Sequence, residues 1–340
     1  MNIFIRVDAS VELGTGHLMR CLTLANRIKK EGKEVSFICR RAKGDCIQLI
    51  KDNGFEVYTL PAVELSLWVY AKIEWQIDAT QTIEILRKFN VQQVVVDHYS
   101  LDEKWEKQIR PFTKEVMVID DLANRPHDCD LLLDQNYYLN MGSRYNGLVP
   151  SHAKLLLGPQ HVLLREEFKE ARKYIKPFNG KVERLFIFFG GSDPTNETEK
   201  VLRAIKPLVQ KYRLKADVVV GNTNPKKEVI EALCTEITGV SYQGQINNMA
   251  ELMARADLAI GAGGATTWER IYLQLPSIVI TVADNQIEIA KAVHFKQLCF
   301  YLTHYSEVCP YMISDFLEYI LYSPKCIENS ILNMHNFIIN

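Results

Sequence analysis

The chain has 340 residues, and its 40 Lys and Arg residues nearly balance its 41 Asp and Glu residues. This length suits two domains of roughly 150 to 180 residues each, and the balanced charge gives no support to a nucleic-acid partner. Because no apolar run approaches the roughly 20 residues that cross a bilayer, and because the chain begins with a predicted strand rather than a signal-peptide pattern, we expect a cytoplasmic protein without membrane insertion.

The first pattern along the chain is a strand, a glycine loop and a helix. An apolar run at 3–5 is followed by Gly14, Gly16 and His17, and then by an amphipathic helix over 18–28. The glycines let a ligand approach the backbone, and the positive end of the helix favours a neutral imidazole that can accept a proton. A GxG turn is also common in parallel α/β proteins, where the histidine would only cap or pack. These residues alone leave both interpretations open.

Strands and helices alternate through the rest of the first half, which predicts a parallel sheet. We expect strands over 34–39, 55–60, 91–96, 116–119 and 129–133, with helices over 45–53 and 75–89.

Polar residues follow two of these strands, where ligands bind in open parallel sheets. Asp97, His98 and Tyr99 follow the 91–96 strand. Alternatively, Asp97 caps a helix that begins near residue 101 and His98 is packed. Asp120 and Asp121 follow the next strand, but adjacent residues of an extended chain point to opposite sides. A capping or loop role is therefore favoured for them over a carboxylate pair.

The cysteines and histidines give no metal-site pattern. Eight cysteines are scattered without a CxxC pair, which favours free thiols. The sequence His127, Asp128, Cys129 has no second pair at metal-site spacing. We expect no metal and no other cofactor.

The segment 176–183 combines proline, glycine and charge, and it predicts a boundary between domains 1–175 and 176–340. A second alternation follows, which predicts another doubly wound domain. Its expected strands are 184–189, 216–220, 240–242, 258–260 and 277–282, and its expected helices are 195–210, 226–235, 248–256, 267–275 and 286–296. Further helices are expected at 312–321 and 324–338.

Two glycine loops of the second domain predict contacts to a diphosphate. Residues 190–193 read Gly-Gly-Ser-Asp, and residues 261–269 contain three glycines, two threonines and Glu269. Bare backbone amides and hydroxyls suit phosphate oxygens, and Glu269 could accept hydrogen bonds from a ribose. No Gly-Lys-Ser or Gly-Lys-Thr ends the 261–269 loop, so it is not a Walker A loop. Plain helix capping is the alternative for 261–269. Residues 284–286 are a further pocket candidate.

Taken together, these motifs resemble a known family. The two α/β domains and their glycine loops resemble GT-B nucleotide-sugar enzymes. The match is closer to the pseudaminic-acid pathway hydrolases that remove UDP from UDP-2,4-diacetamido-2,4,6-trideoxy-β-L-altropyranose, and similar sequences are grouped with spore-coat polysaccharide proteins. It covers roughly residues 1–290 and rests on segments 6–10, 14–20, 96–99, 120–121, 129–133, 164–168 and 190–193. One departure is Trp268, where some members carry Asn.

The resemblance implies a fold of two Rossmann-like doubly wound domains facing across a cleft. It implies that His17 is the general base that activates water, that the first domain holds the sugar and that the second holds UDP. The expected sugar-site residues are Asp8, Gly14, Gly16, Arg20 and Tyr99. The expected UDP-binding residues are Gly190, Gly191, Ser192, Gly263, Gly264, Ala265, Thr266, Glu269 and Gln286.

The implied reaction is the hydrolysis of a small-molecule UDP-sugar with inversion at the anomeric carbon. Two other functions remain open on the sequence. One is a GT-B glycosyltransferase, in which the same base would deprotonate an acceptor hydroxyl. The other is a non-catalytic nucleotide-sugar-binding protein, in which His17 is only structural.

Overall fold

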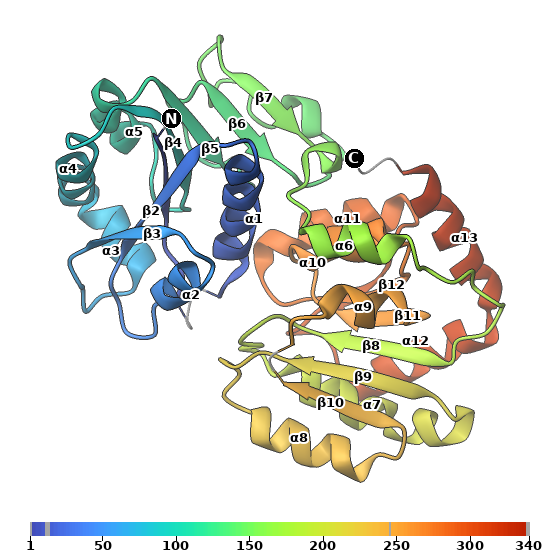
Figure 1. The fold of residues 1–340 in the computed structure, drawn as a ribbon. Helices are drawn as coiled ribbons and strands as arrows, with labels where there is room; N and C mark the ends of the chain where they lie inside the picture. Colours follow the sequence, from blue (N-terminus) through green and yellow to red (C-terminus); the bar gives the residue numbers. More distant parts are fainter. Residues whose placement is uncertain (1, 11–13, 245, 338–340) are drawn as a thin grey trace. The chain divides into compact units, whose positions relative to one another are not determined.

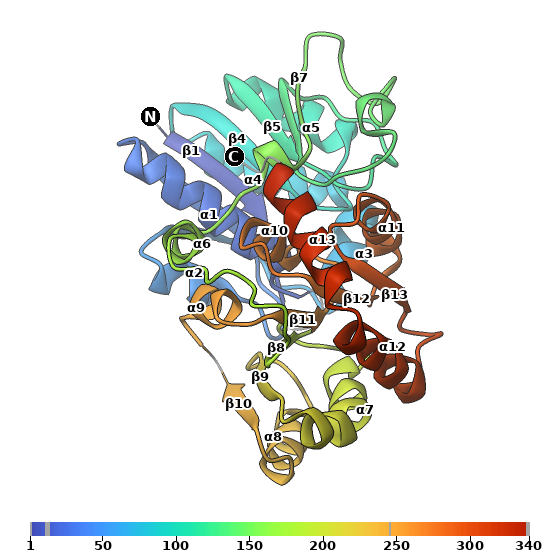
Figure 2. The same cartoon turned by 90° about the vertical axis from the view of Figure 1, so that its right-hand side faces the viewer.

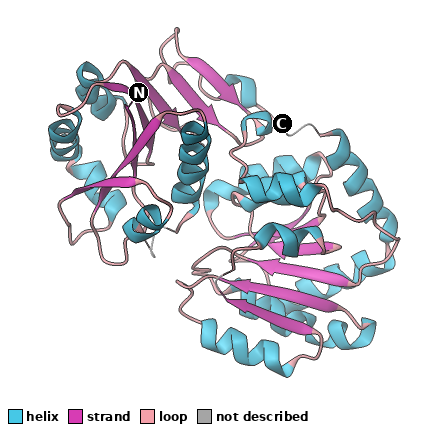
Figure 3. Ribbon diagram, viewed as in Figure 1, coloured by secondary structure: helices cyan, strands magenta, loops and turns pink. Residues whose placement is uncertain are grey.

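The structure is a computed structural model that describes residues 2–10, 14–244 and 246–337. It divides into two compact units, Met1–Leu163 and Leu164–Asn340 (Figure 1). Each unit is a parallel sheet with helices on its faces (Figure 3). Within the described ranges no helix is both long enough and apolar enough to cross a membrane.

Unit 1 contains a seven-stranded sheet in the order β3-β2-β1-β4-β5-β6-β7, and each neighbouring pair is parallel. The strands read as short apolar runs because both faces of the sheet are covered. Their bounds are β1 (Asn2–Val7), β2 (Glu34–Arg40), β3 (Glu56–Leu60), β4 (Val91–Asp97), β5 (Glu115–Ile119), β6 (Leu131–Asp134) and β7 (Lys154–Leu157).

Helices cover both faces of this sheet and give three layers. On one face lie α1 (Gly16–Lys30) and α2 (Ile47–Asp52), and the buried stripe of α1 packs on alternate residues of β1. On the other face lie α3 (Leu67–Ile73), α4 (Trp75–Leu86) and α5 (Glu103–Ile109). The sequence did not predict α3, because Val69 and Ile73 are exposed while Leu67 and Ala71 are buried, so its apolar residues form no single face.

Unit 2 contains a six-stranded parallel sheet in the order β10-β9-β8-β11-β12-β13. Its strands are β8 (Arg184–Phe188), β9 (Lys215–Val220), β10 (Val240–Gly244), β11 (Leu258–Gly261), β12 (Ser277–Thr281) and β13 (Phe300–His304). Its helices are α6 (Glu166–Arg172), α7 (Glu197–Tyr212), α8 (Lys227–Glu236), α9 (Met249–Ala254), α10 (Thr266–Tyr272), α11 (Ile287–Phe295), α12 (Pro310–Tyr322) and α13 (Pro324–Asn336). One core is formed by α7, α8 and α12 against the sheet, and α12 lies beside α7 (Figure 2).

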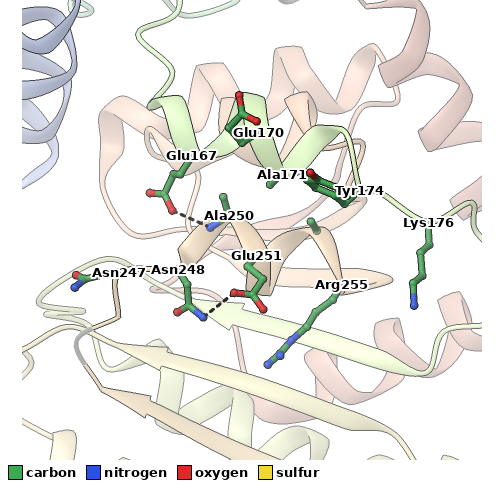
Figure 4. A pocket seen from close by; sticks show the side chains of 11 residues that line it. Glu167, Glu170, Ala171, Tyr174, Lys176, Asn247, Asn248, Ala250, Glu251 and Arg255 are labelled. Atoms are coloured by element: carbon green, nitrogen blue, oxygen red, sulfur yellow. Dashed lines mark hydrogen bonds between the residues drawn. The ribbon is translucent and has the colours of Figure 1, made fainter.

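The division between the units lies earlier than the sequence indicated. Helix α6 belongs to unit 2, because Phe168 is buried in one core with Phe186 and Met253. In addition, the carboxylate of Glu167 accepts a hydrogen bond from the backbone N–H of Ala250, at 3.3 Å (Figure 4). The proline and glycine of segment 176–183 mark the connection between α6 and β8, not the boundary between 175 and 176.

Candidate functional site

The candidate site of unit 1 lies where the strand order reverses. The chain winds outward from β1 in one direction and from β4 in the other, and Val7 of β1 lies beside Asp97 of β4. Ligands bind outside the carboxyl ends of strands at such a switch point. Because α1 begins shortly after β1, His17 is held at this same edge.

His17 and Asp97 form a hydrogen-bonded pair. The Nδ1 atom of His17 lies 2.5 Å from the Oδ1 atom of Asp97. A carboxylate at this distance favours the tautomer that carries its proton on Nδ1, which leaves a lone pair on Nε2 that can accept a proton. The side chain of His17 is 11% exposed, whereas that of Asp97 is fully buried. The pair thus presents an oriented proton acceptor.

Arg20 holds the carboxylate of Asp97 in place. Its Nε and Nη2 atoms donate to the two oxygens of Asp97, each at 2.6 Å, and its Nη1 atom donates to Asp121 at 2.9 Å. Burial alone would raise the pKa of Asp97, but Arg20 and His17 hold that pKa well below its usual range. Asp97 is therefore a carboxylate at neutral pH, and it stabilises a proton taken up by His17.

Two aromatic side chains form a wall beside His17. The ring of Tyr99 lies edge-on to it, with centroids 4.4 Å apart, and Trp68 of α3 stacks on Tyr99 at 5.2 Å. Trp68 also lies 5.5 Å from the ring of His17. Trp68 was not predicted from the sequence, although its position after the carboxyl end of a strand was a usable signal. Burial and the neighbouring Asp121 raise the pKa of Tyr99.

Asp8 is enclosed by other residues of unit 1, and its contact with the sugar stays a prediction. Asp8 is only 2% exposed. Its carboxylate accepts hydrogen bonds from Arg6 at 2.6 Å and from the backbone N–H of Arg40 at 2.8 Å. The Nε2 atom of His98 lies 3.3 Å from its other oxygen. His98 is buried, as the packing interpretation expected, and burial lowers its pKa.

The capping interpretation of Asp97 is wrong, because α5 is capped by Asp102, which accepts from the backbone N–H of Lys104 at 2.9 Å. The two adjacent aspartates do act separately. Asp120 accepts from the backbone N–H of Ala123 and has a loop role, whereas Asp121 reaches Arg20. The sequence did not predict this contact of Asp121.

Two glycines precede His17 in the chain. Gly14 has a φ of 79°, a conformation that favours glycine, and its N–H donates to the carbonyl of Ser10 at 2.9 Å. A Cβ atom at Gly16 would meet nothing within 4 Å. The structure therefore brings Arg20 and Tyr99 next to His17, and Gly14 and Gly16 lie in the segment that leads to it.

In unit 2, the two glycine loops follow β8 and β11, which are neighbours at the reversal of the strand order. Gly190 has a φ of 101°, and a Cβ atom on Gly221 would stand 2.1 Å from the carbonyl oxygen of Gly191. The carboxylate of Asp193 accepts from the N–H groups of Glu197 and Thr198. The first turn of α7 is thus already capped by protein, and only Gly190, Gly191 and Ser192 remain as UDP-binding candidates at this loop.

The loop after β11 packs closely on Gln286. A Cβ atom on Gly263 would stand 3.3 Å from the Cβ of Gln286, and one on Gly264 would stand 3.6 Å from its Nε2 atom. The Oε1 atom of Gln286 accepts from the backbone N–H of Val282 at 3.0 Å. The structure therefore brings Gly263, Gly264 and Gln286 together, with Ala265 and Thr266 at the start of α10.

Glu269 carries one occupied and one unoccupied carboxylate oxygen. Arg165 holds Oε1 at 3.0 Å through Nη2. The buried Oε2 atom has no hydrogen-bond partner among the described residues, and burial raises the pKa of the group. Trp268, where some similar sequences have Asn, is fully buried.

Unit 2 also contains a pocket that lies apart from the predicted site residues. A pocket of about 460 Å³ lies between α6 and α9, lined among others by Tyr174 and Asn248, and it contains none of the predicted site residues (Figure 4). Within the described ranges, no group of three or more His, Cys, Asp and Glu side chains is arranged to hold a metal ion.

Comparison with known proteins gives relatives of low identity. Residues 185–326 match the Glycosyltransferase family 28 C-terminal domain. An uncharacterized protein of Methanocaldococcus jannaschii, MJ1062, is 26% identical over 294 residues, which are 85% of this chain and 57% of that protein. The UDP-2,4-diacetamido-2,4,6-trideoxy-β-L-altropyranose hydrolase of Campylobacter jejuni is 25% identical over 286 residues, which are 84% of this chain and 93% of the hydrolase.

Solved structures extend the match to the whole fold. The crystal structure of MurG from Acinetobacter baumannii is similar with a TM-score of 0.66 at 15% sequence identity, covering 98% of this chain and 94% of that one. The parallel sheets of seven and six strands fit this likeness. The chain therefore has the two-domain α/β fold of the GT-B glycosyltransferases, and its second domain matches the C-terminal domain of glycosyltransferase family 28.

Proposed function

We propose that the protein is a nucleotide-sugar hydrolase that releases UDP from UDP-2,4-diacetamido-2,4,6-trideoxy-β-L-altropyranose, a step of pseudaminic acid or related nonulosonate biosynthesis. The observation that carries this proposal is the hydrogen bond between His17 and Asp97, which leaves Nε2 of His17 as the proton acceptor. The hydrolase from C. jejuni, which aligns with 84% of this chain, supports the choice of substrate. We assign the base and the sugar contacts to unit 1, and the UDP contacts to unit 2.

His17 acts as the general base in this mechanism. Its Nε2 atom takes a proton from a water molecule while the water oxygen bonds to the anomeric carbon. The resulting imidazolium is stabilised by Asp97, which Arg20 keeps ionised and oriented. A positioned base of this kind contributes roughly 10²- to 10⁴-fold to the rate.

The departure of UDP needs less catalytic assistance than the attack of water. As the bond between the anomeric carbon and the phosphate oxygen breaks, its electron pair goes to UDP, which is a stable anion. Backbone amides of residues 263–266 and 190–192 can stabilise this charge. Attack from the face opposite UDP inverts the anomeric centre, and the scheme uses no cofactor.

We assign the aromatic wall to the sugar because it lies beside the proposed base. Trp68 and Tyr99 present apolar surface next to His17, and aromatic rings pack well against groups that combine apolar and polar edges. A 6-deoxy sugar with two acetamido groups carries apolar methyl groups of this kind.

A second candidate is a GT-B glycosyltransferase, which the family 28 match of residues 185–326 favours. The same base would then deprotonate an acceptor hydroxyl instead of water. The two functions differ in one requirement, because only the transferase needs an acceptor.

The test is UDP release from a panel of UDP-2,4-diacetamido sugars with no acceptor present. We expect multiple turnovers with the trideoxy-altropyranose substrate. UDP release should be slower from epimers that differ in configuration at the carbons that carry the acetamido groups. UDP-N-acetylglucosamine serves as the control for general nucleotide-sugar breakdown. UDP formation only after addition of an acceptor would refute the hydrolase and favour the transferase.

A further inference from the structure

Arg270 is a buried cation directly beneath the glycine loop that follows β11. It is 1% exposed. Its Nη2 atom donates to the carbonyl oxygen of Ala262 at 2.7 Å and lies 3.3 Å from the hydroxyl of Thr267. Its buried Nε atom has no hydrogen-bond partner in the described part of the chain. The loop thus lies against a positively charged guanidinium group whose Nε–H makes no hydrogen bond to a described residue.

The other buried arginines are neutralised by carboxylates. Arg6 pairs with Asp8 and Asp78, Arg40 pairs with Asp78, and Arg20 pairs with Asp97 and Asp121, as shown by ion pairs of 2.6 to 2.9 Å. Arg270 forms no such ion pair with a described residue, so it differs from the rest of the buried set.

The ionisable neighbours of Arg270 form no ion pair with it among the described residues. The carboxylate of Glu269 is held by Arg165. Burial raises the pKa of the Cys299 thiol to about 12, so this neighbour is uncharged at neutral pH. Burial also lowers the pKa of Arg270 to about 10, which still leaves it a cation. A buried charge without a partner is costly, and the cost is relieved when a counter-charge arrives.

The backbone next to Arg270 leaves room for its guanidinium group. A Cβ atom on Gly261 would stand 2.8 Å from the Nη1 atom of Arg270 and 2.4 Å from the carbonyl oxygen of Phe188. Glycine at this position therefore lets the guanidinium lie against the loop. Through its bond to Ala262, the same guanidinium fixes where the following amides point.

We propose that Arg270 supplies the counter-charge for the diphosphate of a nucleotide bound at residues 262–266. It is a positioning residue: it holds the carbonyl of Ala262, and its charge acts on the anion through an interior in which electrostatic interactions are weakly screened. The choice of a nucleoside diphosphate as ligand rests on the proposed function.

The test compares calorimetric binding of UDP and of uridine to the whole protein and to Arg270→Met. We expect the variant to lose about tenfold or more in UDP affinity while its affinity for uridine stays unchanged. Arg203→Met removes the same charge from an exposed pair with Glu199 in the same unit, and it serves as the control that should bind both ligands normally.

Thermal unfolding separates this role from a structural one. We expect ligand-free Arg270→Met to have a Tm close to that of the wild type, because loss of the hydrogen bond to Ala262 is offset by removal of an unpaired buried charge, and to gain less Tm when UDP is added. A structural role would instead lower the Tm of the ligand-free variant and weaken the binding of UDP and uridine equally.

Each remaining outcome is decisive. Unchanged UDP affinity in the variant overturns the proposal but leaves the proposed hydrolase untouched. If the wild type does not prefer UDP over uridine, both the proposal and the UDP assignment of this loop fail. If Arg270→Met does not fold, Arg270→Gln replaces it, and failure of both to fold overturns the proposal in favour of a structural role. Failure of the hydrolysis assay alone does not affect these binding measurements.

Discussion

Replacing His17 by Asn lowers kcat for acceptor-free UDP release by roughly 10²- to 10⁴-fold and leaves the affinity for UDP nearly unchanged. The Asn side chain can still donate a hydrogen bond to Asp97, but it has no basic nitrogen in place of Nε2. Since we assign UDP binding to unit 2, loss of the base should not weaken it. Initial-rate kinetics and calorimetry with UDP measure the two quantities separately.

The matched control is His152→Asn. His152 belongs to the same unit, its side chain is 64% exposed, and it lies 3.4 Å from Asp130. We expect this variant to keep the wild-type kcat. If His17→Asn were as active as this control, His17 would be structural and the non-catalytic interpretation would be favoured.

Replacing Asp97 by Asn reduces both activity and stability. The carboxylate receives two donors from Arg20 and one from His17, and the thiol of Cys21 lies 3.3 Å from it. An amide has only one acceptor oxygen, so at least one donor of Arg20 faces an N–H group. Breaking a buried pair in this way costs about 3 kcal/mol, and loss of the negative charge beside His17 lowers kcat by roughly 10²-fold or more.

The pH dependence of the unfolding free energy tests whether Asp97 acts as a carboxylate in the folded protein. Because the pKa of Asp97 is lower in the folded than in the unfolded protein, its stabilising contribution is complete above about pH 4 and is lost as the pH falls through the folded-state pKa. The difference in unfolding free energy between wild type and Asp97→Asn should therefore shrink in acid. Chemical denaturation at several pH values measures it.

Asp128→Asn is the control for this second prediction. Asp128 pairs with Arg110 at 2.6 Å in the same unit, but both side chains are partly exposed. Partly exposed pairs contribute about 1 kcal/mol or less, so this variant should be nearly as stable and as active as the wild type. Equal effects of the two substitutions would contradict a special role for Asp97.

The sequence predicted the fold well because local periodicity determines most of it. The buried run of β4 and the amphipathic α1 are recognisable without any knowledge of their partners. The helix α3 was missed because its apolar residues face both the core and the solvent. The predicted boundary between the two domains lies too late in the chain, because proline and glycine mark a connection between two elements. The packing of Phe168 decides to which unit α6 belongs.

The candidate site was only partly predictable because its contacts join distant parts of the chain. His17 and Asp97 are 80 positions apart, and Arg20 and Asp121 are 101 apart. The sequence and its family resemblance predicted His17, Arg20 and Tyr99 as site residues, but they did not reveal that Asp97 orients His17 or that Asp8 is enclosed. Pairings of this kind depend on strand order, which periodicity does not reveal.

The central claim is that water, activated by His17, attacks the anomeric carbon of a UDP-sugar. Hydrolysis in ¹⁸O-labelled water, without an acceptor, tests it most directly. The mechanism predicts that mass spectrometry finds the released UDP unlabelled, because the bond that breaks lies between carbon and oxygen, and that the label enters the free sugar. Label in the phosphate of UDP, or no UDP release until an acceptor is added, would contradict it.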